Sequence, residues 1–428
     1  MCGILFTLIS SKPLTYSCSF NPFAASLNNS YVKNMPEIIK FDYVSNIFSN
    51  QLFPLDFTLN DIKHSIKPRG PDHYDHFLYD IKNNKKISLT NKDIGEEKNT
   101  DHILIESEPI FETLAKTNDS LITLAASSVL HLRGVQGQIP SMPFINETTG
   151  NILLYNGELY DISKDLLSLI EEKLFEYDHQ NQIITLLQGF SRAENDTEQI
   201  FKILDLLSQL NIKADDYLHI VNLIFSSFKG DFSILFFDNS TKRIFIGKDN
   251  IGKRSLLLGI RPDGFIITSV APKKETKKIE MGEEEEKEGD SNKEEVQETA
   301  ISKKYLAEFL AGKQKEWLEI NPASMTVISL NVLSNSLKID NYPYLKNKDS
   351  LKFDKLQMDP CEFVEGILVN CVKKLLESTI EYKHIFEKNN ELEKTANNEA
   401  KIAVMFSGGL DSTLIAHVIN LLLPKQEK

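Results

Sequence analysis

A nearly continuous apolar run begins at the second residue of the chain, where Cys2 to Ile9 reads CGILFTLI. An uncharged run of this length is typical of a buried strand. We therefore expect a strand that starts almost at the amino terminus, with Cys2 at its first position. Any fold for this chain has to bury that first strand.

Short apolar strands punctuated by turn residues recur along the first 350 residues. Between them, 161–173 and 196–210 repeat Leu and Ile at helical spacing. Strands interleaved with hairpins and separated by helices favour stacked α+β layers over the repeated units of a Rossmann fold. The further strands that we expect are 120–132, 150–155, 234–238, 243–246, 255–258, 264–269 and 325–330.

The pattern changes near residue 350. Residues 361–377 form an amphipathic helical pattern, and the run KIAVMF at 401–406 is typical of a buried strand. That run leads through SGGLDS into an apolar helix at 413–423. A strand, a glycine loop and a helix in this order indicate the start of an α/β domain.

Charge is concentrated in one stretch, residues 273–299, which holds eleven acidic residues against six lysines. With almost no apolar side chains, it cannot bury enough surface to offset its ordering entropy. We predict a disordered, solvated insertion, with a functional acidic tail as the alternative. The net charge of −13 gives no electrostatic reason to expect a nucleic-acid partner.

The 428 residues suggest two to three domains. No apolar stretch approaches the ~18 residues of a membrane span, and the amino terminus lacks the features of a signal peptide. The four cysteines show no CxxC spacing, which favours neither a structural zinc site nor a disulfide framework. We therefore expect a cytoplasmic protein without a membrane partner.

Cys2 follows Met1 directly, and a residue this small permits removal of Met1. The free α-amino group then left on Cys2 has a reference pKa of about 7.7–8.0, so it can accept the thiol proton. One residue would supply both nucleophile and base. The alternative is an ordinary buried cysteine.

Other segments carry groups suited to the same chemistry. The side-chain amide of Asn156 and the backbone N–H of Gly157 can form an oxyanion hole, although Asn-Gly is also typical of a hairpin turn. The planar fork of Arg133 suits a carboxylate. Asp196 could bind an ammonium group, or it could simply cap the helix that begins there.

Five short motifs follow one another along the chain. They are CGI at the start, RGPD (Arg69 to Asp72), HLRG, YNGELY and DTE. Together they resemble the class II glutamine amidotransferase domain of the asparagine synthetase family. The resemblance implies an α+β N-terminal-nucleophile fold, an αββα sandwich over residues 2–345, that hydrolyses L-glutamine to glutamate and ammonia. By this resemblance, Cys2 is nucleophile and base, Asn156 and the Gly157 N–H stabilise the oxyanion, and RGPD has a structural role. The implied substrate ligands are Arg133 for the α-carboxylate, and Glu158 and Asp196 for the α-amino group.

SGGLDS, from Ser407 to Ser412, is the second motif. Two glycines let a backbone approach an anion, and N–H groups at the following helix start point toward it. The motif resembles the pyrophosphate loop of ATP-pyrophosphatase enzymes, although it could be only a tight turn. The resemblance implies the beginning of an incomplete α/β synthetase domain at 355–428 that binds ATP and Mg²⁺ and amidates L-aspartate. The implied ligands are Ser407, Gly408, Gly409, Leu410, Asp411 and Ser412, with Asp411 serving Mg²⁺.

The chain departs from the usual family pattern. The family hairpin that reads RD, then G, then PLY is here GKDNIGKRSLLLG, with Lys248 for Arg and Ser255 for Pro. Several stretches, including the acidic one, are longer than in ordinary asparagine synthetases. These features favour the eukaryotic asparagine synthetase domain-containing proteins.

Only 16 residues follow Ser412, and one strand with one helix lacks the neighbours that a parallel sheet needs. We expect a truncated sequence, or a homodimer or other partner that completes the domain, and no asparagine formation by this chain alone. Three functions stay open. They are a glutamine-dependent ligase, a stand-alone glutaminase and a catalytically silent regulatory protein.

Overall fold

The computed structural model describes twelve segments of the chain and divides it into two compact units. One comprises Met1–Phe190 and Asn195–Leu345, and the other Ser191–Glu194 and Lys346–Lys428. The acidic stretch 273–299, predicted to be disordered, lies outside the described residues. The described segments are 2–12, 14–18, 57–87, 121–131, 141–175, 177, 180–190, 194–261, 263–272, 317–345, 359–377 and 403–423.

The first sheet of the larger unit is built around the amino-terminal strand β1 (Gly3–Ser10). β1 pairs on one side with β5 (Leu121–Val129) and on the other with β11 (Gly264–Thr268). All eight of its residues are buried, which confirms the expected strand. The other strands are β3 (His73–Asp80) and β4 (Lys85–Ile87) beyond β5, and β10 (Leu257–Arg261) and β12 (Leu318–Glu319) beyond β11.

The second sheet runs in the order β2-β14-β13-β9-β8-β7-β6. Its neighbouring strands are antiparallel except for β2 and β14, which are parallel. The strands are β2 (Thr15–Cys18), β14 (Ser336–Pro343), β13 (Ser324–Asn331), β9 (Arg243–Lys248), β8 (Phe228–Asp238), β7 (Ile152–Ile162) and β6 (Phe144–Ile145).

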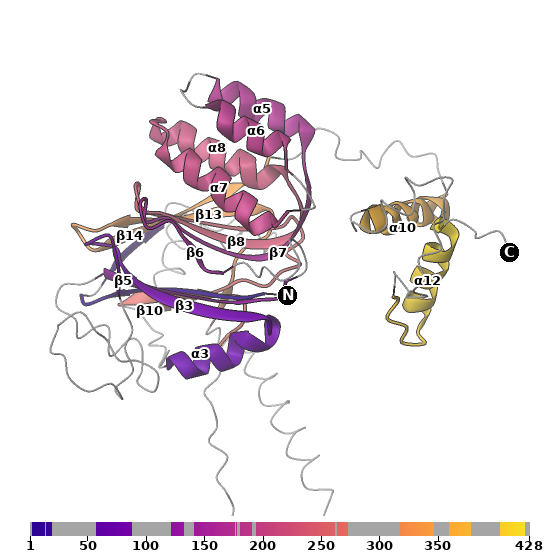
Figure 1. The fold of residues 1–428 in the computed structure, drawn as a ribbon, viewed down its shortest axis with the longest axis horizontal. Helices are drawn as coiled ribbons and strands as arrows, with labels where there is room; N and C mark the ends of the chain where they lie inside the picture. Colours follow the sequence, from indigo (N-terminus) through magenta and orange to yellow (C-terminus); the bar gives the residue numbers. More distant parts are fainter. Residues whose placement is uncertain are drawn as a thin grey trace, which may run out of the picture. The chain divides into compact units, whose positions relative to one another are not determined.

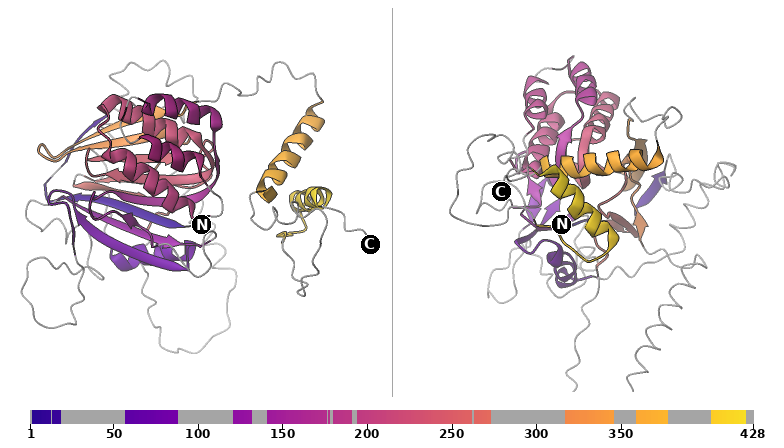
Figure 2. Two further views of the ribbon diagram at one scale, coloured as in Figure 1. Left: turned by 45° about the horizontal axis from the view of Figure 1, so that its top comes forward. Right: turned by 90° about the vertical axis from the view of Figure 1, so that its right-hand side faces the viewer.

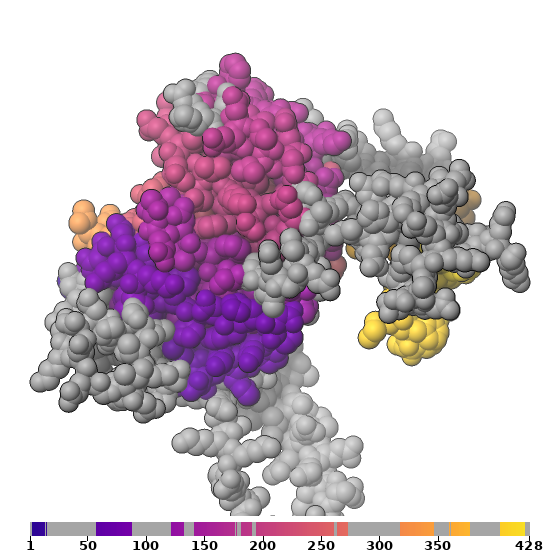
Figure 3. All heavy atoms as spheres, in the orientation of Figure 1, coloured from indigo at the N-terminus to yellow at the C-terminus, as the bar shows by residue number. Residues whose placement is uncertain are grey.

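The two sheets face each other, and helices cover their outer faces (Figure 1). A second view shows the helical layer over the second sheet (Figure 2). In the space-filling view, atoms of the magenta and pink segments form the top of this unit, and atoms of the violet segments lie below them (Figure 3). Separate apolar clusters fill the three interfaces between layers. The αββα sandwich is thus confirmed. The helices are α5 (Lys164–Leu174), α6 (Gln180–Gln188), α7 (Asp196–Gln209) and α8 (Ala214–Ser227) over the second sheet, and α3 (Leu59–Ile66) with the short 3₁₀ helix η1 (Lys67–Arg69) over the first.

Strand β7 corrects one interpretation of the sequence. Asn156 and Gly157 were also compatible with a hairpin turn, but both lie inside β7, which continues to Ile162. Gly157 is opposite Phe232 of β8, and a Cβ atom at Gly157 would overlap the backbone carbonyl oxygen of Asp231. Glycine is therefore present because two strands approach closely, not because the chain reverses.

The smaller unit shows two helices among its described residues, α10 (Pro360–Glu377) and α12 (Leu410–Leu422). They pack through Val372, Leu376 and Val418. The strand predicted at 401–406 is wrong for residues 403–406, which adopt no strand, and Met405 is 94% exposed. No described strand of this unit offers the pairing that a buried strand needs. In the described part of the chain, no helix has the length and apolar character that a bilayer crossing requires.

Candidate active site

The first residues of β1 are held in place by hydrogen bonds on the outer side of the first sheet. The backbone N–H of Gly3 donates to Ser128 Oγ at 3.0 Å, and that hydroxyl donates to the carbonyl oxygen of Ile66 at 2.6 Å. A Cβ at Gly3 would lie only 2.6 Å from the same carbonyl oxygen. The glycine after Cys2 thus lets η1 and α3 pack tightly against the strand that presents the candidate nucleophile.

Cys2 meets Asn156 although 154 residues separate them. The backbone N–H of Cys2 donates to Asn156 Oδ1 at 3.1 Å. Asn156 is 0% exposed, and its Nδ2 has no hydrogen-bond partner among the described residues. A buried amide with its acceptor engaged by Cys2 and its donor free is suited to binding an oxyanion.

The Cys2 thiol lies in a partly buried, acidic environment. Burial raises its pKa, and the carboxylates of Asp196 and Glu158 raise it further. A hydrogen bond with the Leu130 backbone and the positive charge of the amino terminus act in the opposite direction. The raised pKa means that the thiol needs a nearby base to react at neutral pH.

Asp196 joins the start of α7 to the middle of β7. Its Oδ2 accepts from the backbone N–H of Leu159 at 3.0 Å, and its Oδ1 accepts from that of Thr197 at 2.9 Å. The side chain is 5% exposed. The alternative of a capping role is wrong, because Asn195 is the N-cap and its side chain accepts from the Glu198 N–H at 3.0 Å. Asp196 is thus held at the start of α7 with its carboxylate bound to β7, where its charge acts on the Cys2 thiol.

Arg133 lies outside the described residues, but the structure shows how the preceding segment is anchored. Asp72, the last residue of RGPD, accepts a hydrogen bond from the His131 N–H through Oδ2 at 2.7 Å. Its own N–H donates to the Val129 carbonyl oxygen at 3.1 Å, and Pro71 forms a bridge with Val129. RGPD therefore holds the end of β5 at Val129 and also His131, which lies two residues before Arg133.

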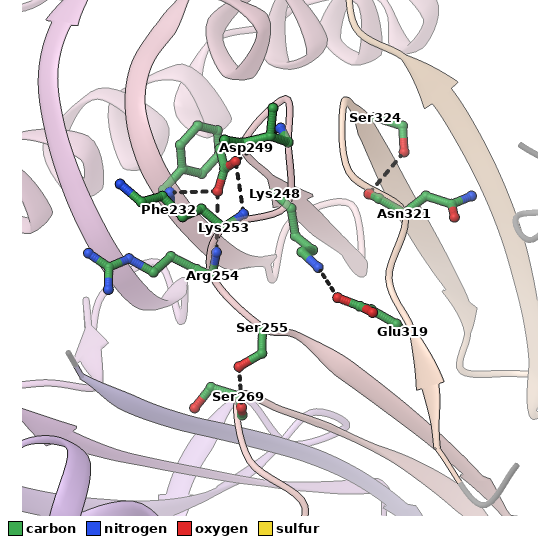
Figure 4. A network of polar contacts seen from close by, with 11 residues as sticks. Phe232, Lys248, Asp249, Lys253, Arg254, Ser255, Ser269, Glu319, Asn321 and Ser324 are labelled. Atoms are coloured by element: carbon green, nitrogen blue, oxygen red, sulfur yellow. Dashed lines mark hydrogen bonds and ion pairs between the residues drawn. The ribbon is translucent and has the colours of Figure 1, made fainter. Parts of the chain in front are cut away.

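Sequence reasoning missed the buried polar groups on β8 and β9. Asp231 of β8 accepts from the Tyr160 hydroxyl at 2.6 Å and pairs with the Arg254 guanidinium. Lys248 of β9 has a side chain that is 0% exposed, and its Nζ lies 2.7 Å from Glu319 Oε1 (Figure 4). The only sequence signal was the departure of this hairpin from the family pattern.

The loop that follows β9 is organised by one carboxylate and one hydroxyl (Figure 4). Asp249 accepts from the backbone N–H groups of Phe232 at 3.2 Å and Lys253 at 3.1 Å. Ser255, where the family has Pro, donates to the Ser269 carbonyl oxygen at 2.6 Å, and Ser269 Oγ accepts from the Ile4 N–H at 3.0 Å. The loop is thus tied to β1 two residues from Cys2.

In the smaller unit, SGGLDS forms an exposed turn into α12. Gly408 has φ +82° and Gly409 is the N-cap residue. Ser412 Oγ donates to the Gly409 carbonyl oxygen at 3.0 Å, and the Ser407 and Ser412 hydroxyls are 3.2 Å apart. Among the residues that the structure describes, no group of three or more His, Cys, Asp or Glu could hold a metal. Any Mg²⁺ at Asp411 would need ligands besides the described acidic side chains.

Comparison with known families agrees with this site. Residues 132–273 match a family model described as a glutamine amidotransferase domain. Over these residues the larger unit, which has αββα layers and a cysteine at the start of β1, is similar to a glutamine amidotransferase domain.

Among individual proteins, the chain is similar to asparagine synthetase domain-containing protein 1. It is 23% identical to the Homo sapiens protein over 349 residues, which cover 73% of this chain and 48% of that protein. A segment of 151 residues is 30% identical to the Gallus gallus protein, covering 35% and 18% respectively. The asparagine synthetase-like resemblance is confirmed at low identity. The chain spans about half the length of the human relative.

Two solved structures are also similar. One is a glutamine phosphoribosylpyrophosphate amidotransferase from B. subtilis complexed with ADP and GMP, at TM-score 0.27 and 16% identity, covering 54% of this chain and 36% of that one. The other is described as the allosteric regulatory enzyme of purine biosynthesis, at TM-score 0.33 and 13% identity, covering 80% and 49%.

Proposed function

We propose that the larger unit hydrolyses L-glutamine with Cys2 as nucleophile and base. The observation that carries this proposal is the contact of the Cys2 backbone nitrogen with Asn156 Oδ1 at 3.1 Å, which leaves Asn156 Nδ2 buried and free beside the nucleophile. A neutral thiol with a raised pKa, next to a free α-amino group, has the base that it needs.

The reaction then follows from these groups. After removal of Met1, the Cys2 amine accepts the thiol proton and Sγ attacks the carboxamide carbon of glutamine. The electron pair of the C=O bond moves onto oxygen, where Asn156 Nδ2 and the Gly157 N–H stabilise it. The ammonium group of Cys2 returns the proton to the departing nitrogen as ammonia forms. Water then hydrolyses the thioester to glutamate.

Substrate recognition is assigned to three charged residues. Arg133 would bind the α-carboxylate through its planar fork, and Glu158 and Asp196 would hold the α-amino group. Support for the two acids is that both act electrostatically on the Cys2 thiol. Asp196 is also fixed to β7 at Leu159, next to Glu158.

We further propose that the ammonia is passed to an ATP-dependent domain that amidates L-aspartate and that begins with SGGLDS. A Cβ at Gly408 would meet nothing within 4 Å, so an anion has room to approach this backbone. The residues fit a phosphate group, since hydroxyls of Ser407 and Ser412 flank the start of α12. Asp411 would hold Mg²⁺ together with phosphate oxygens. The bound nucleotide would supply activation of the aspartate β-carboxylate.

One experiment tests the nucleophile directly. Intact-mass analysis of the purified chain is expected to show loss of Met1 and a single adduct with a glutamine-mimicking electrophile. Cys2→Ala is expected to abolish both the adduct and glutamate release, and Cys361→Ser, which changes an exposed free thiol, is the matched control. An adduct that persists in Cys2→Ala contradicts the assignment.

The second activity has a separate assay. Formation of asparagine from ATP and aspartate, with either glutamine or ammonia as donor, is measured beside glutamate release. Glutamate without asparagine from the full-length protein would favour a stand-alone glutaminase, and neither product would favour a silent protein.

A further inference from the structure

The oxyanion side of the candidate site extends beyond Asn156 onto the neighbouring strands. Asn156 of β7 is directly opposite Ser233 of β8, and Ser233 is opposite Lys248 of β9. Residues opposite each other in antiparallel strands point to the same face of a sheet. Leu235 and Phe237, two and four residues after Ser233, belong to the apolar cluster between the sheets. Ser233 therefore faces the interior on the same side as Asn156.

Ser233 is unusual among the buried serines of this unit. It is 0% exposed, and its hydroxyl has no hydrogen-bond partner among the described residues. By contrast, the buried hydroxyls of Ser127, Ser128 and Ser227 donate to backbone carbonyl oxygens at 3.1, 2.6 and 2.7 Å. A buried polar group without a hydrogen-bond partner is energetically unfavourable. Such a group therefore indicates a ligand that supplies the missing hydrogen bond.

Two unpaired donors therefore lie side by side, Asn156 Nδ2 and the Ser233 hydroxyl. The Cβ atoms of opposite residues are about 4.5–5.5 Å apart, so both donors can reach one atom placed between them. The next side chain in the row, Lys248, is fully buried, and its Nζ is paired with Glu319 Oε1. Two unpaired donors side by side favour a ligand atom that carries negative charge.

We propose that Ser233 is a further catalytic residue of the glutaminase site, donating its hydroxyl hydrogen bond to the oxyanion of the tetrahedral intermediate. This rests on the proposed glutamine hydrolysis. As the bond between Cys2 Sγ and the carboxamide carbon forms, the carbonyl electron pair moves to oxygen, and that oxygen accepts from Ser233 together with Asn156. When the carbon–nitrogen bond breaks, the charge returns to the carbonyl and the nitrogen leaves as ammonia with the proton held by the Cys2 amine.

Ser233→Ala tests this, because it removes the hydroxyl and little else. We expect kcat for glutamine hydrolysis to fall by roughly tenfold or more, with KM changed less than about twofold. Affinity for the aldehyde analogue of glutamine, which forms a tetrahedral adduct with the thiol, is expected to fall by the same factor, whereas affinity for glutamate is unchanged. Ser233→Thr, which keeps the hydroxyl, is expected to restore most of kcat.

Ser227→Ala is the matched control, since it removes an equally buried hydroxyl that already donates to Ile224. It is expected to lower thermal stability without changing the ratio of aldehyde to glutamate affinity. An unchanged kcat in Ser233→Ala, or a rise in KM alone, would overturn the role of Ser233 while leaving the proposed hydrolysis intact. Failure of the proposed hydrolysis would show instead as full glutamate release by Cys2→Ala.

Discussion

Close backbone contacts restrict the residue type at positions of this site as much as the chemistry does. Gly157 is the clearest case, because a side chain there would overlap the carbonyl oxygen of Asp231 on the neighbouring strand. The same residue is proposed to supply an oxyanion N–H. A substitution at Gly157 therefore tests packing before it tests catalysis.

We expect Gly157→Ala to destabilise the larger unit by about 1–3 kcal/mol, since the clash is with backbone that cannot rotate away. Gly366→Ala in α10 is the control, because a Cβ there meets nothing within 4 Å. In an exposed helix the same change is expected to stabilise by about 0.5–1 kcal/mol. Chemical denaturation of both variants measures the two effects, and equal shifts in one direction would contradict the packing argument.

We predict how the reactivity of the Cys2 thiol depends on pH. Burial raises its pKa, so below that pKa the thiol is protonated and the thiolate fraction rises about tenfold for each unit of pH. A chain with an uncleavable amino-terminal extension lacks the free amine that would take the proton. We expect its Cys2 to react slowly with an alkylating reagent at pH 7 and progressively faster through pH 9, whereas the chain that begins at Cys2 reacts readily at pH 7.

Rates at Cys2 are read by peptide-resolved mass spectrometry, with Cys2→Ala to subtract the other cysteines. Fast reaction of the extended chain at pH 7 would show that burial does not control this thiol.

At the scale of elements, the site depends on how strand ends are held. The end of β5 is fixed by Asp72 of the RGPD motif, which accepts from the His131 N–H at 2.7 Å. Since Arg133 follows two residues later, this hydrogen bond is expected to restrict where the guanidinium can lie.

Asp72→Ala is therefore expected to raise KM for glutamine several-fold, by about 1 kcal/mol for one lost hydrogen bond, with a much smaller effect on kcat. Asp75→Asn serves as the control, since that carboxylate on β3 accepts from the His76 N–H at 2.8 Å and from the Ser141 hydroxyl at 3.5 Å, and not from the His131 N–H. Steady-state kinetics of both variants decide the point. A fall in kcat at unchanged KM would place Asp72 in a different role.

For the whole molecule, the acidic stretch 273–299 lies between β11 and β12, which both pair with β10 in the first sheet. If it is a solvated insertion, deleting it only shortens a connection. The entropy of closing a shorter loop then favours the folded state by less than ~1 kcal/mol. We expect glutamate release to be unchanged and the melting temperature equal or slightly higher.

A variant that keeps the length of this stretch but replaces its glutamates by glutamine separates charge from length. Loss of glutaminase activity in either variant, with the fold retained, would favour the alternative of a functional acidic segment.

Local sequence pattern was enough to predict the elements whose burial follows from that pattern. The apolar run after Cys2 became β1, the leucine repeats became α5 and α7, and the glycine loop leads into α12. β3, whose sequence HYDHFLYD begins with polar residues, had no such pattern, and its strand conformation comes from pairing with β5. Residues 403–406 show the opposite case, because their apolar pattern, without described partner strands, does not form a strand.

Contacts between side chains that are distant in the sequence depend on the tertiary fold. Motif order indicated that Cys2 and Asn156 act together, but the 3.1 Å contact exists because the start of β1 in one sheet faces the interior of β7 in the other. Ser233 carried no signal in the sequence, where it is one serine in an apolar strand. Its importance comes from strand register, which places its unpaired hydroxyl opposite Asn156. Register depends on the pairing of distant segments, and local sequence does not encode that pairing.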